Sequence, residues 1–358
     1  MREQRGNIMK VVDMHCDTIS TLLKRNRAGE NISLRENDCH ISLEKMKKGD
    51  YLLQNFALFV ELRKCNDPWQ EVQELFSLYT QEIMENKDWI APVLSYHDIT
   101  ENMRQNKMSA MLTVEEGGVC GGEIEKLRIL YKQGVRMMTL SWNYPNELCY
   151  PNLDKIKHQK IDIAKNGGNQ SVLNMVTLNY LNTPNKKDGL TEKGIAFVQE
   201  MEKLGMIVDV SHMSDAGFYD VLKYTQKPFV ASHSNARKIC PCVRNLSDDM
   251  IRKLGEKGGV MGLNFCSDFL MQVPVGVKNP GSISSVVNHA KHITAVGGIE
   301  CMGLGTDFDG IDTHQELPGA DTMDRLWDAL KKNGYTEGQL DKIFTENVLR
   351  VYKDNLDK

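Results

Sequence analysis

Residues 282–307 read SISSVVNHAKHITAVGGIECMGLGTD, and this stretch sets the pattern for the fold. Its first part, Ser282–Val296, has helical spacing and ends at a pair of glycines, which is a common stop for a helix. The apolar run Cys301–Gly305 follows, as expected of a strand that is buried on both faces, and Asp307 comes shortly after it. The stretch therefore predicts a helix, a strand and a carboxylate at the carboxyl end of that strand.

The same unit recurs along the chain. Short apolar, β-branched runs that are typical of buried parallel strands occupy Met9–Met14, Leu53–Phe59, Ala110–Val114, Val135–Leu140, Ile207–Val210, Phe229–Ala231, Val260–Phe265 and Cys301–Gly305. Segments with helical spacing lie between them, among them Ile124–Gln133, Thr191–Leu204 and Ser247–Lys257. Eight strands that alternate with helices predict an α/β fold, a (β/α)8 TIM-like barrel, and leave a doubly wound open sheet as the alternative.

The chain shows no sign of being divided into domains. Its 358 residues contain no repeat, no low-complexity tract and no linker rich in Gly, Ser or Pro, so we expect a single domain over 1–358. Ser141–Asp188 is too long for an ordinary loop and is rich in Asn, Lys and Pro. This interval predicts an active-site insertion at about 141–188, over one end of the barrel.

Composition and charge indicate which kinds of binding partner and which location to expect for the protein. A net charge of −4 gives no reason to expect a nucleic acid or an anionic membrane. No run approaches the ~20 apolar residues of a membrane span, and the polar start of the chain lacks a signal-peptide core, so we expect a cytoplasmic protein. The nine cysteines have no paired spacing, which favours reduced thiols; Cys240 and Cys242 could bind a metal, but no second pair accompanies them.

Polar side chains gather where several of the predicted strands end. They are His15 and Asp17 after the first strand, Glu115 and Glu116 after the third, His212 after the fifth, His233 after the sixth, and Asp307 and Asp309 after the eighth. In a barrel the carboxyl ends of all strands face the same mouth, so these residues should meet there. A mixed set of imidazoles and carboxylates suits Zn²⁺, with Mn²⁺ or Co²⁺ as alternatives.

Each of these motifs alone also has a structural explanation. A histidine at the end of a strand is more often a satisfied structural residue, Glu116 could precede a tight turn, and Asp307 could cap the following helix. Because five different strands end in ligand-type residues, we favour the metal site over these separate explanations. His289 and His292 stand three apart in a predicted helix, which predicts a structural role outside the barrel.

With these residues in view, the sequence resembles the membrane (renal) dipeptidase family of zinc peptidases. The resemblance runs from Val12 to about Tyr352 and rests on ordered motifs: His-x-Asp, Glu-Gly-Gly, Val-Ser-His, Ser-His-Ser, Arg-Asn-Leu-Ser-Asp-Asp and Gly-x-Asp-Phe-Asp-Gly. It implies a soluble bacterial-type metallo-dipeptidase with small dipeptide substrates, and it is compatible with a homodimer.

The resemblance also implies roles for individual residues. The implied metal ligands are His15 and Asp17 for one zinc ion, His212 and His233 for a second, and Glu116 as the bridge, favoured over Glu115 because it adjoins Gly117-Gly118. Asp307 matches the acid/base aspartate of the family, and Arg244 matches the arginine that contacts the substrate. Trp142 stands where eukaryotic members have a substrate-contacting histidine, so we expect it to take that place beside the substrate.

These residues predict amide hydrolysis at two metal ions. A hydroxide that bridges the metals would attack the carbonyl of a dipeptide, Asp307 would carry a proton to the leaving amine, and Arg244 would hold a free carboxylate. By the resemblance, the substrates include dipeptides with a C-terminal D-residue. Two alternatives remain open: another metal-dependent amide, lactam or ester hydrolase on the same barrel, and a non-catalytic metal-binding scaffold.

Overall fold

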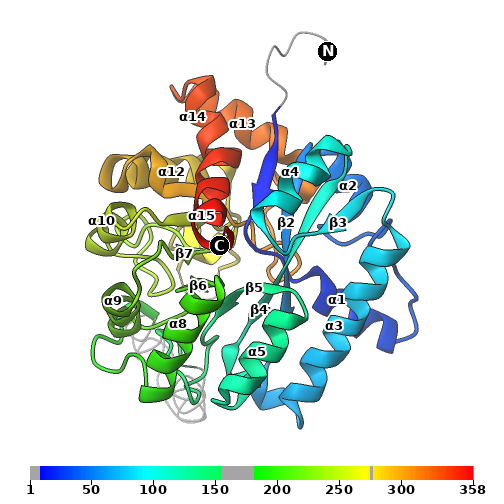
Figure 1. Cartoon of the computed structure of the whole chain (residues 1–358). Coiled ribbons are helices and arrows are strands. Elements are labelled where there is room, and N and C mark those ends of the chain that lie inside the picture. Colours follow the sequence, from blue (N-terminus) through cyan, green and yellow to red (C-terminus); the bar gives the residue numbers. More distant parts are fainter. Residues whose placement is uncertain (1–8, 155–180, 275–276, 358) are drawn as a thin grey trace.

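Parallel strands surrounded by helices make up the described part of the chain (Figure 1). The computed structural model describes residues 9–154, 181–274 and 277–357. The strands are β1 (Val11–Asp13), β2 (Tyr51–Phe59), β3 (Ile90–Pro92), β4 (Met108–Glu115), β5 (Val135–Thr139), β6 (Ile207–Asp209), β7 (Val230–Ala231), β8 (Val260–Leu263) and β9 (Met302–Leu304). The α-helices are α1 (Thr18–Arg27), α2 (Leu43–Lys48), α3 (Pro68–Glu85), α4 (Tyr96–Arg104), α5 (Ile124–Lys132), α8 (Glu192–Leu204), α9 (Asp215–Tyr224), α10 (Asp248–Glu256), α11 (Ser267–Leu270), α12 (Ile283–Gly297), α13 (Met323–Lys332), α14 (Glu337–Asp341) and α15 (Asn347–Leu356).

The sheet closes on itself. β1 pairs with β2 on one side and with β9 on the other, where Asp13 faces Leu304, and β2 pairs with β4 along Leu53–Phe59. Eight strands, β1, β2 and β4 to β9, therefore form a closed parallel barrel, which confirms the predicted (β/α)8 fold and excludes the open doubly wound sheet. β3 was not predicted; it is only three residues long, ends in Pro92 and pairs with the start of β4, so it leaves little pattern in the sequence.

Helix boundaries follow the capping residues. The Thr191 hydroxyl accepts the N–H of Gly194 at the start of α8, and Gly205, at φ 79°, ends that helix. Ser247 caps α10 in the same way, with two aspartates in the first turn. The predicted helices agree with the observed ones to within one or two residues at each end.

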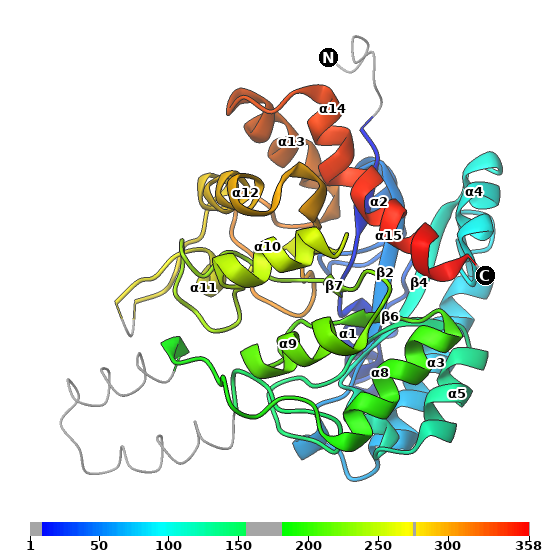
Figure 2. The same cartoon turned by 60° about the vertical axis from the view of Figure 1, so that its left-hand side comes forward.

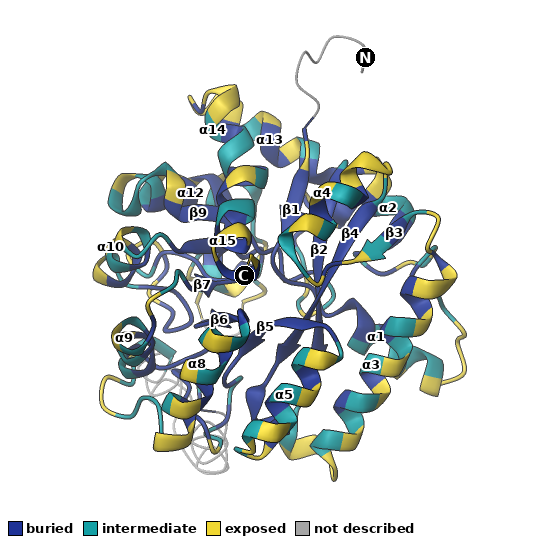
Figure 3. Cartoon of the chain, in the orientation of Figure 1, coloured by how far each residue is buried: buried dark blue, intermediate teal, exposed yellow. Residues whose placement is uncertain are grey.

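Two apolar layers stabilise the barrel. The larger lies between the strands and the surrounding helices, whose outward faces are exposed (Figure 3). The smaller contains side chains from the starts of strands, such as Val12 and Val260, together with Tyr352 of α15. Tyr352 is fully buried and donates a hydrogen bond of 2.9 Å to Asn55. Helix α15 therefore covers the amino-terminal end of the barrel (Figures 1 and 2). The predicted site residues follow the carboxyl ends of the strands, at the opposite end of the barrel.

The expected insertion falls mostly outside the described residues, because 155–180 are among those not described. Its first residues are anchored: Pro151 forms a β-bridge with Met213, and Cys149 forms one with Leu190. Within the described ranges, every helix is too short or too polar to traverse a lipid bilayer.

Candidate active site

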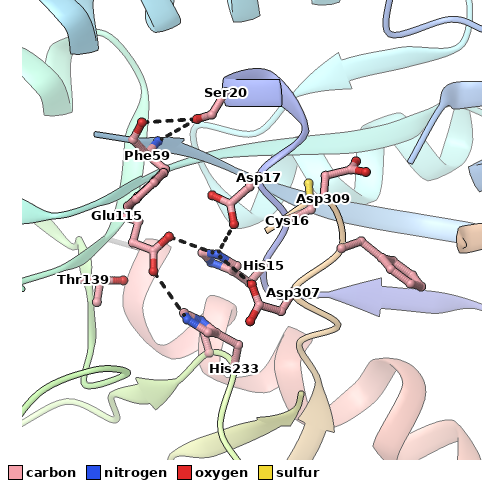
Figure 4. A network of polar contacts seen from close by, with 12 residues as sticks. His15, Cys16, Asp17, Ser20, Phe59, Glu115, Thr139, His233, Asp307 and Asp309 are labelled. Carbon is pink, nitrogen blue, oxygen red and sulfur yellow. Dashed lines mark hydrogen bonds and ion pairs between the residues drawn. The ribbon is translucent and has the colours of Figure 1, made fainter. Parts of the chain in front are cut away.

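His15 and Asp17 follow β1 at the carboxyl end of the barrel (Figure 4). His15 Nε2 lies 3.4 Å from Asp17 Oδ2 and 3.3 Å from Glu115 Oε2. Both side chains are buried, yet His15 Nε2 and Asp17 Oδ1 have no hydrogen-bond partner among the described residues. Burial opposes a charge on His15, but the carboxylates of Glu115 and Asp17 outweigh it and raise the pKa of His15 well above its usual value. This part of the site therefore attracts positive charge.

His212 and His233 follow β6 and β7 and reach the same point from the other side. Their Nε2 atoms are 3.0 Å apart, and they lie 2.9 Å and 3.5 Å from Glu115 Oε1. Burial lowers the pKa of His212 well below its usual value and that of His233 to about 4. Both imidazoles are therefore neutral at pH 7, the form in which histidine binds metals.

The carboxylate of Glu115 stands between His15 and His233 (Figure 4). Its Oε2 faces His15 and its Oε1 faces His212 and His233. Burial alone raises the pKa of Glu115, but the charge of His15 outweighs burial and lowers the pKa well below its usual value. Glu115 is therefore an ionised carboxylate with one oxygen for each side of the site.

The sequence predicts Glu116 as the bridging residue, but the structure does not place Glu116 among the histidines. Its carboxylate turns away and accepts the N–H groups of Gly118, at 2.9 Å, and Trp142, at 3.0 Å. The physical reason lies in β4, which ends at Glu115: side chains alternate along a strand, so Glu115 faces the barrel interior with Met111. At Glu116, with φ 85°, the backbone has already entered the turn. Alternation along β4 points to Glu115 as the residue that faces the histidines, whereas the glycine pair points to Glu116, one residue further along.

The donor set fits divalent cations. Among the described residues, three groups place one nitrogen or carboxylate oxygen from each member within 4.8 Å of the others: His15 with Asp17 and Glu115, Glu115 with His212 and His233, and His15 with His233 and Asp307. A cation at this position would also provide a partner for the buried His15 Nε2 and Asp17 Oδ1. Imidazole nitrogens combined with carboxylate oxygens are the ligands of catalytic zinc sites.

Asp307 follows β9 and points at the same cluster. Its backbone has φ 64°, a conformation that is uncommon outside glycine and is found at functional sites. Its Oδ1 lies 3.9 Å from His15 Nε2, and its Oδ2 accepts a hydrogen bond of 2.8 Å from Asn264. Burial raises the pKa of Asp307 to about 7, which suits a group that takes up and releases a proton near neutral pH. Asn264 was not predicted, because the predicted strand Val260–Phe265 includes it, whereas β8 ends at Leu263.

Arg244 is buried beside this cluster. Its side chain donates a hydrogen bond of 3.3 Å to the carbonyl oxygen of His233, and its guanidinium lies 5.3 Å from the ring centre of Phe269. Its Nε has no hydrogen-bond partner within the described part of the chain. Burial lowers the pKa of Arg244, but an arginine side chain stays charged in proteins. A buried guanidinium with an unsatisfied donor suits a carboxylate ligand.

A cavity of about 320 Å³ opens over the carboxylates of the site. Its aromatic wall contains Phe59 and Trp142, whose ring centres are 4.8 Å apart, and the indole ring lies 6.2 Å from the ring of His212. A cavity of this size accommodates a small ligand. Trp142 therefore lies at the cavity, where the sequence predicts a contact with the substrate.

Several other polar residues have structural roles. His289, in α12, accepts the N–H of Ala236 at 3.0 Å, and His292 forms a hydrogen bond of 2.7 Å with Asp248, as predicted for residues outside the barrel. Asp309 accepts hydrogen bonds from the Thr18 hydroxyl and the N–H of His40. Among the described residues, no cluster of metal-type donors includes Cys240 or Cys242.

Comparison with known sequences places this chain among peptidases. The model of the family described as membrane dipeptidase (peptidase family M19) matches residues 6–171 and 174–357. An uncharacterized protein of Klebsiella pneumoniae, named for its position in the pqqA 5′ region, is 31% identical over 289 residues, which cover 80% of this chain and 97% of that protein. An uncharacterized dipeptidase of Schizosaccharomyces pombe is 29% identical over 369 residues, which cover 96% of this chain and 80% of that protein.

Solved structures share the fold. Dipeptidase AC, a metallopeptidase of family M19, superposes with a TM-score of 0.84 at 22% identity, over 98% of this chain and 100% of that one. A metallopeptidase from Rhodobacter sphaeroides, liganded with a phosphinate mimic of the dipeptide L-Ala-D-Ala, has a TM-score of 0.82 at 22% identity with the same coverage. Since the family model matches nearly the whole sequence, the chain belongs to the membrane dipeptidase family, peptidase family M19.

Proposed function

We propose that this metallo-dipeptidase holds two zinc ions at the carboxyl end of its barrel and hydrolyses dipeptides there. The proposed ligands are His15 and Asp17 for one ion, His212 and His233 for the other, and Glu115 as the bridge. One observation carries the proposal: the two oxygens of Glu115 face different histidines, with Oε2 at 3.3 Å from His15 Nε2 and Oε1 at 2.9 Å from His212 Nε2. Mn²⁺ or Co²⁺ would fit the same donors.

We also propose that residues 1–358 form one (β/α)8 metallohydrolase domain. The pairing of β1 with β9 supports this, because it joins the two ends of the chain in one barrel. Residues 141–188 form the active-site insertion in this proposal. The bridge between Pro151 and Met213 supports that role, because it holds the start of the insertion beside the loop that carries His212.

Bound zinc supplies a Lewis acid for the substrate carbonyl and lowers the pKa of water. Asp307 moves the proton: Asn264 occupies its Oδ2 at 2.8 Å, so Oδ1 is the oxygen turned toward the cluster. That oxygen accepts a proton from the attacking water and delivers it to the amine nitrogen that leaves. A carboxyl group whose pKa is about 7 performs both steps near neutral pH.

Arg244 binds the free carboxylate of the substrate. Its guanidinium is charged and buried, and its fork of donors matches a carboxylate better than a single ammonium group would. A carboxylate required close to the scissile bond selects dipeptides over longer chains. The proposed substrates include dipeptides with a D-residue at the C-terminal side, since the structure of the Rhodobacter sphaeroides metallopeptidase is liganded with a phosphinate mimic of L-Ala-D-Ala.

Elemental analysis together with a panel of L-L and L-D dipeptides tests this function. We expect two zinc ions per chain and release of amino acids that stops after treatment with a chelator and returns with zinc. If zinc-loaded protein released no amino acid from the panel but hydrolysed lactams or esters, the protein would be another metal-dependent hydrolase on the same barrel and not a dipeptidase. A folded protein that bound no metal would contradict both.

Replacing Arg244 with methionine should weaken substrate binding. A hydrogen bond to a charged group contributes roughly 1.5–3 kcal/mol, so kcat/KM should fall roughly 10- to 100-fold, chiefly through KM. Zinc content should stay at the wild-type value. Arg128→Met is the matched control, because Arg128 pairs with Glu200 outside the barrel and should leave KM unchanged. An unchanged KM in Arg244→Met would remove Arg244 from the substrate site.

Replacing Trp142 with alanine should raise KM for dipeptides by about 3- to 10-fold, because an aromatic contact contributes roughly 0.5–1.5 kcal/mol beyond the area that it buries. Trp142→Phe keeps an aromatic wall against Phe59 and should stay closer to the wild type. Steady-state kinetics with zinc-loaded proteins measures both. Equal KM values in all three proteins would show that the indole does not contact the substrate.

A further inference from the structure

Asp209, at the end of β6, is a buried carboxylate directly behind the zinc-binding histidines of the proposed site. Its Oδ1 accepts the N–H groups of Ser211, at 3.0 Å, and Ser232, at 2.8 Å. Its Oδ2 accepts the hydroxyls of Thr139, at 2.6 Å, and Ser232, at 2.5 Å. Four donors converge on its two oxygens, so the group is an ionised acceptor.

Ser232 connects this carboxylate to His233. A serine hydroxyl has a single hydrogen, and in Ser232 that hydrogen is donated to Asp209. The Ser232 oxygen lies 2.7 Å from His233 Nδ1 and can therefore only accept from it. His233 consequently carries its proton on Nδ1, which leaves the lone pair on Nε2, the nitrogen that faces Glu115.

His212 is fixed in the same tautomer by a different group. Its Nδ1 lies 2.9 Å from the amide oxygen of Asn143, which can only accept a hydrogen bond. The Nε2 lone pairs of His212 and His233 then face each other at 3.0 Å, and both face Oε1 of Glu115. These three atoms are all hydrogen-bond acceptors, with no hydrogen between them, so they repel one another unless a cation lies among them.

We propose that Asp209 is a positioning residue that acts through Ser232 to fix the tautomer and ring orientation of His233 for the second zinc ion. This inference rests on the proposed two-zinc function. With asparagine at position 209, the Ser232 hydroxyl would be released to donate to His233 Nδ1, which would place the proton on Nε2 and block the metal-binding lone pair. Partners of this kind behind a metal-binding histidine typically change metal affinity by about 10- to 100-fold.

The experiment compares three variants of the full chain with the wild type. Asp209→Asn and Ser232→Ala both interrupt the connection to His233. Thr139→Val is the matched control, because it removes one hydrogen bond to Asp209 but leaves the Asp209–Ser232–His233 contacts in place. Each metal-free protein is titrated with zinc by calorimetry, its Tm is measured, and the nitrogen chemical shifts of its histidines report the tautomers.

We expect Asp209→Asn and Ser232→Ala to bind one of two zinc ions about 10- to 100-fold more weakly, with the Nδ1–H tautomer of His233 lost. Thr139→Val should bind both ions as the wild type does. Wild-type affinity for both ions in Asp209→Asn and Ser232→Ala would overturn the inference, as would a loss in all three variants that follows the fall in Tm. Wild-type protein that binds fewer than two zinc ions would instead overturn the proposed two-zinc function.

Discussion

The Glu115→Gln variant is expected to bind fewer than two zinc ions per chain and to lose dipeptidase activity by roughly 100-fold or more. Glutamine keeps the shape of the side chain but removes the negative charge that lies between His15 and His212. Breaking a buried charge pair costs about 3–5 kcal/mol, and each 1.4 kcal/mol changes an equilibrium about tenfold. Elemental analysis after dialysis and kcat/KM on a dipeptide of the panel measure the two effects.

Glu116→Gln supplies the control for this experiment, because it makes the same chemical change one residue further along. Its amide nitrogen would meet the N–H of Gly118 or of Trp142, which costs about 1–3 kcal/mol of stability and lowers Tm. Its zinc content should stay at two per chain. If Glu116→Gln lost zinc and Glu115→Gln retained it, the bridge would be Glu116 after all.

The Asp307→Asn variant is expected to keep its zinc and lose turnover. Asparagine can still accept the hydrogen bond from Asn264, but it cannot take a proton from water or return one to the leaving amine. Loss of a general acid and base lowers kcat by about 100- to 10,000-fold. Steady-state kinetics should show this fall in kcat with little change in KM.

Asp309→Asn is the comparison for Asp307. The carboxylate of Asp309 holds the loop at His40 and the start of α1 through hydrogen bonds to His40 and Thr18. We expect this variant to lower Tm and to change kcat far less than Asp307→Asn does. A fall in kcat as large as that of Asp307→Asn, at an unchanged Tm, would place the proton transfer on Asp309 instead.

The sequence predicts the barrel because buried parallel strands have a strong signature. Val260–Leu263 and Met302–Leu304 are apolar on both faces, and glycine and serine caps mark the helices between strands. β3 was not predicted because one of its three residues is proline and only Ile90 is buried. Such a short strand forms only by pairing with β4, and the residues of β3 themselves carry no sign of this pairing.

Polar residues that follow the predicted strands indicate which residues meet at the site, but they do not show where each side chain points. His15, Asp17, His212, His233 and Asp307 lie together as predicted, because the barrel turns all strand ends toward one mouth. Glu115 lies with them where Glu116 was predicted, because the turn signal of the glycine pair was given more weight than the alternation of β4. Supporting groups such as Asn264, Asp209 and Ser232 act through hydrogen bonds to residues far away in the sequence, so their roles depend on the closed barrel. The cytoplasmic location and the homodimer stay predictions.

Closure of the barrel by β1 and β9 makes the active site a late product of synthesis on the ribosome. His15 and Asp17 emerge early, but Asp13 pairs with Leu304, nearly 300 residues later, and Asp307 follows only after that strand. A truncated chain that stops before β9 would contain all five proposed metal ligands and still have no strand to hold β1 against β8. Hydrolytic activity therefore reports an intact chain, and no fragment that ends before β9 should acquire it.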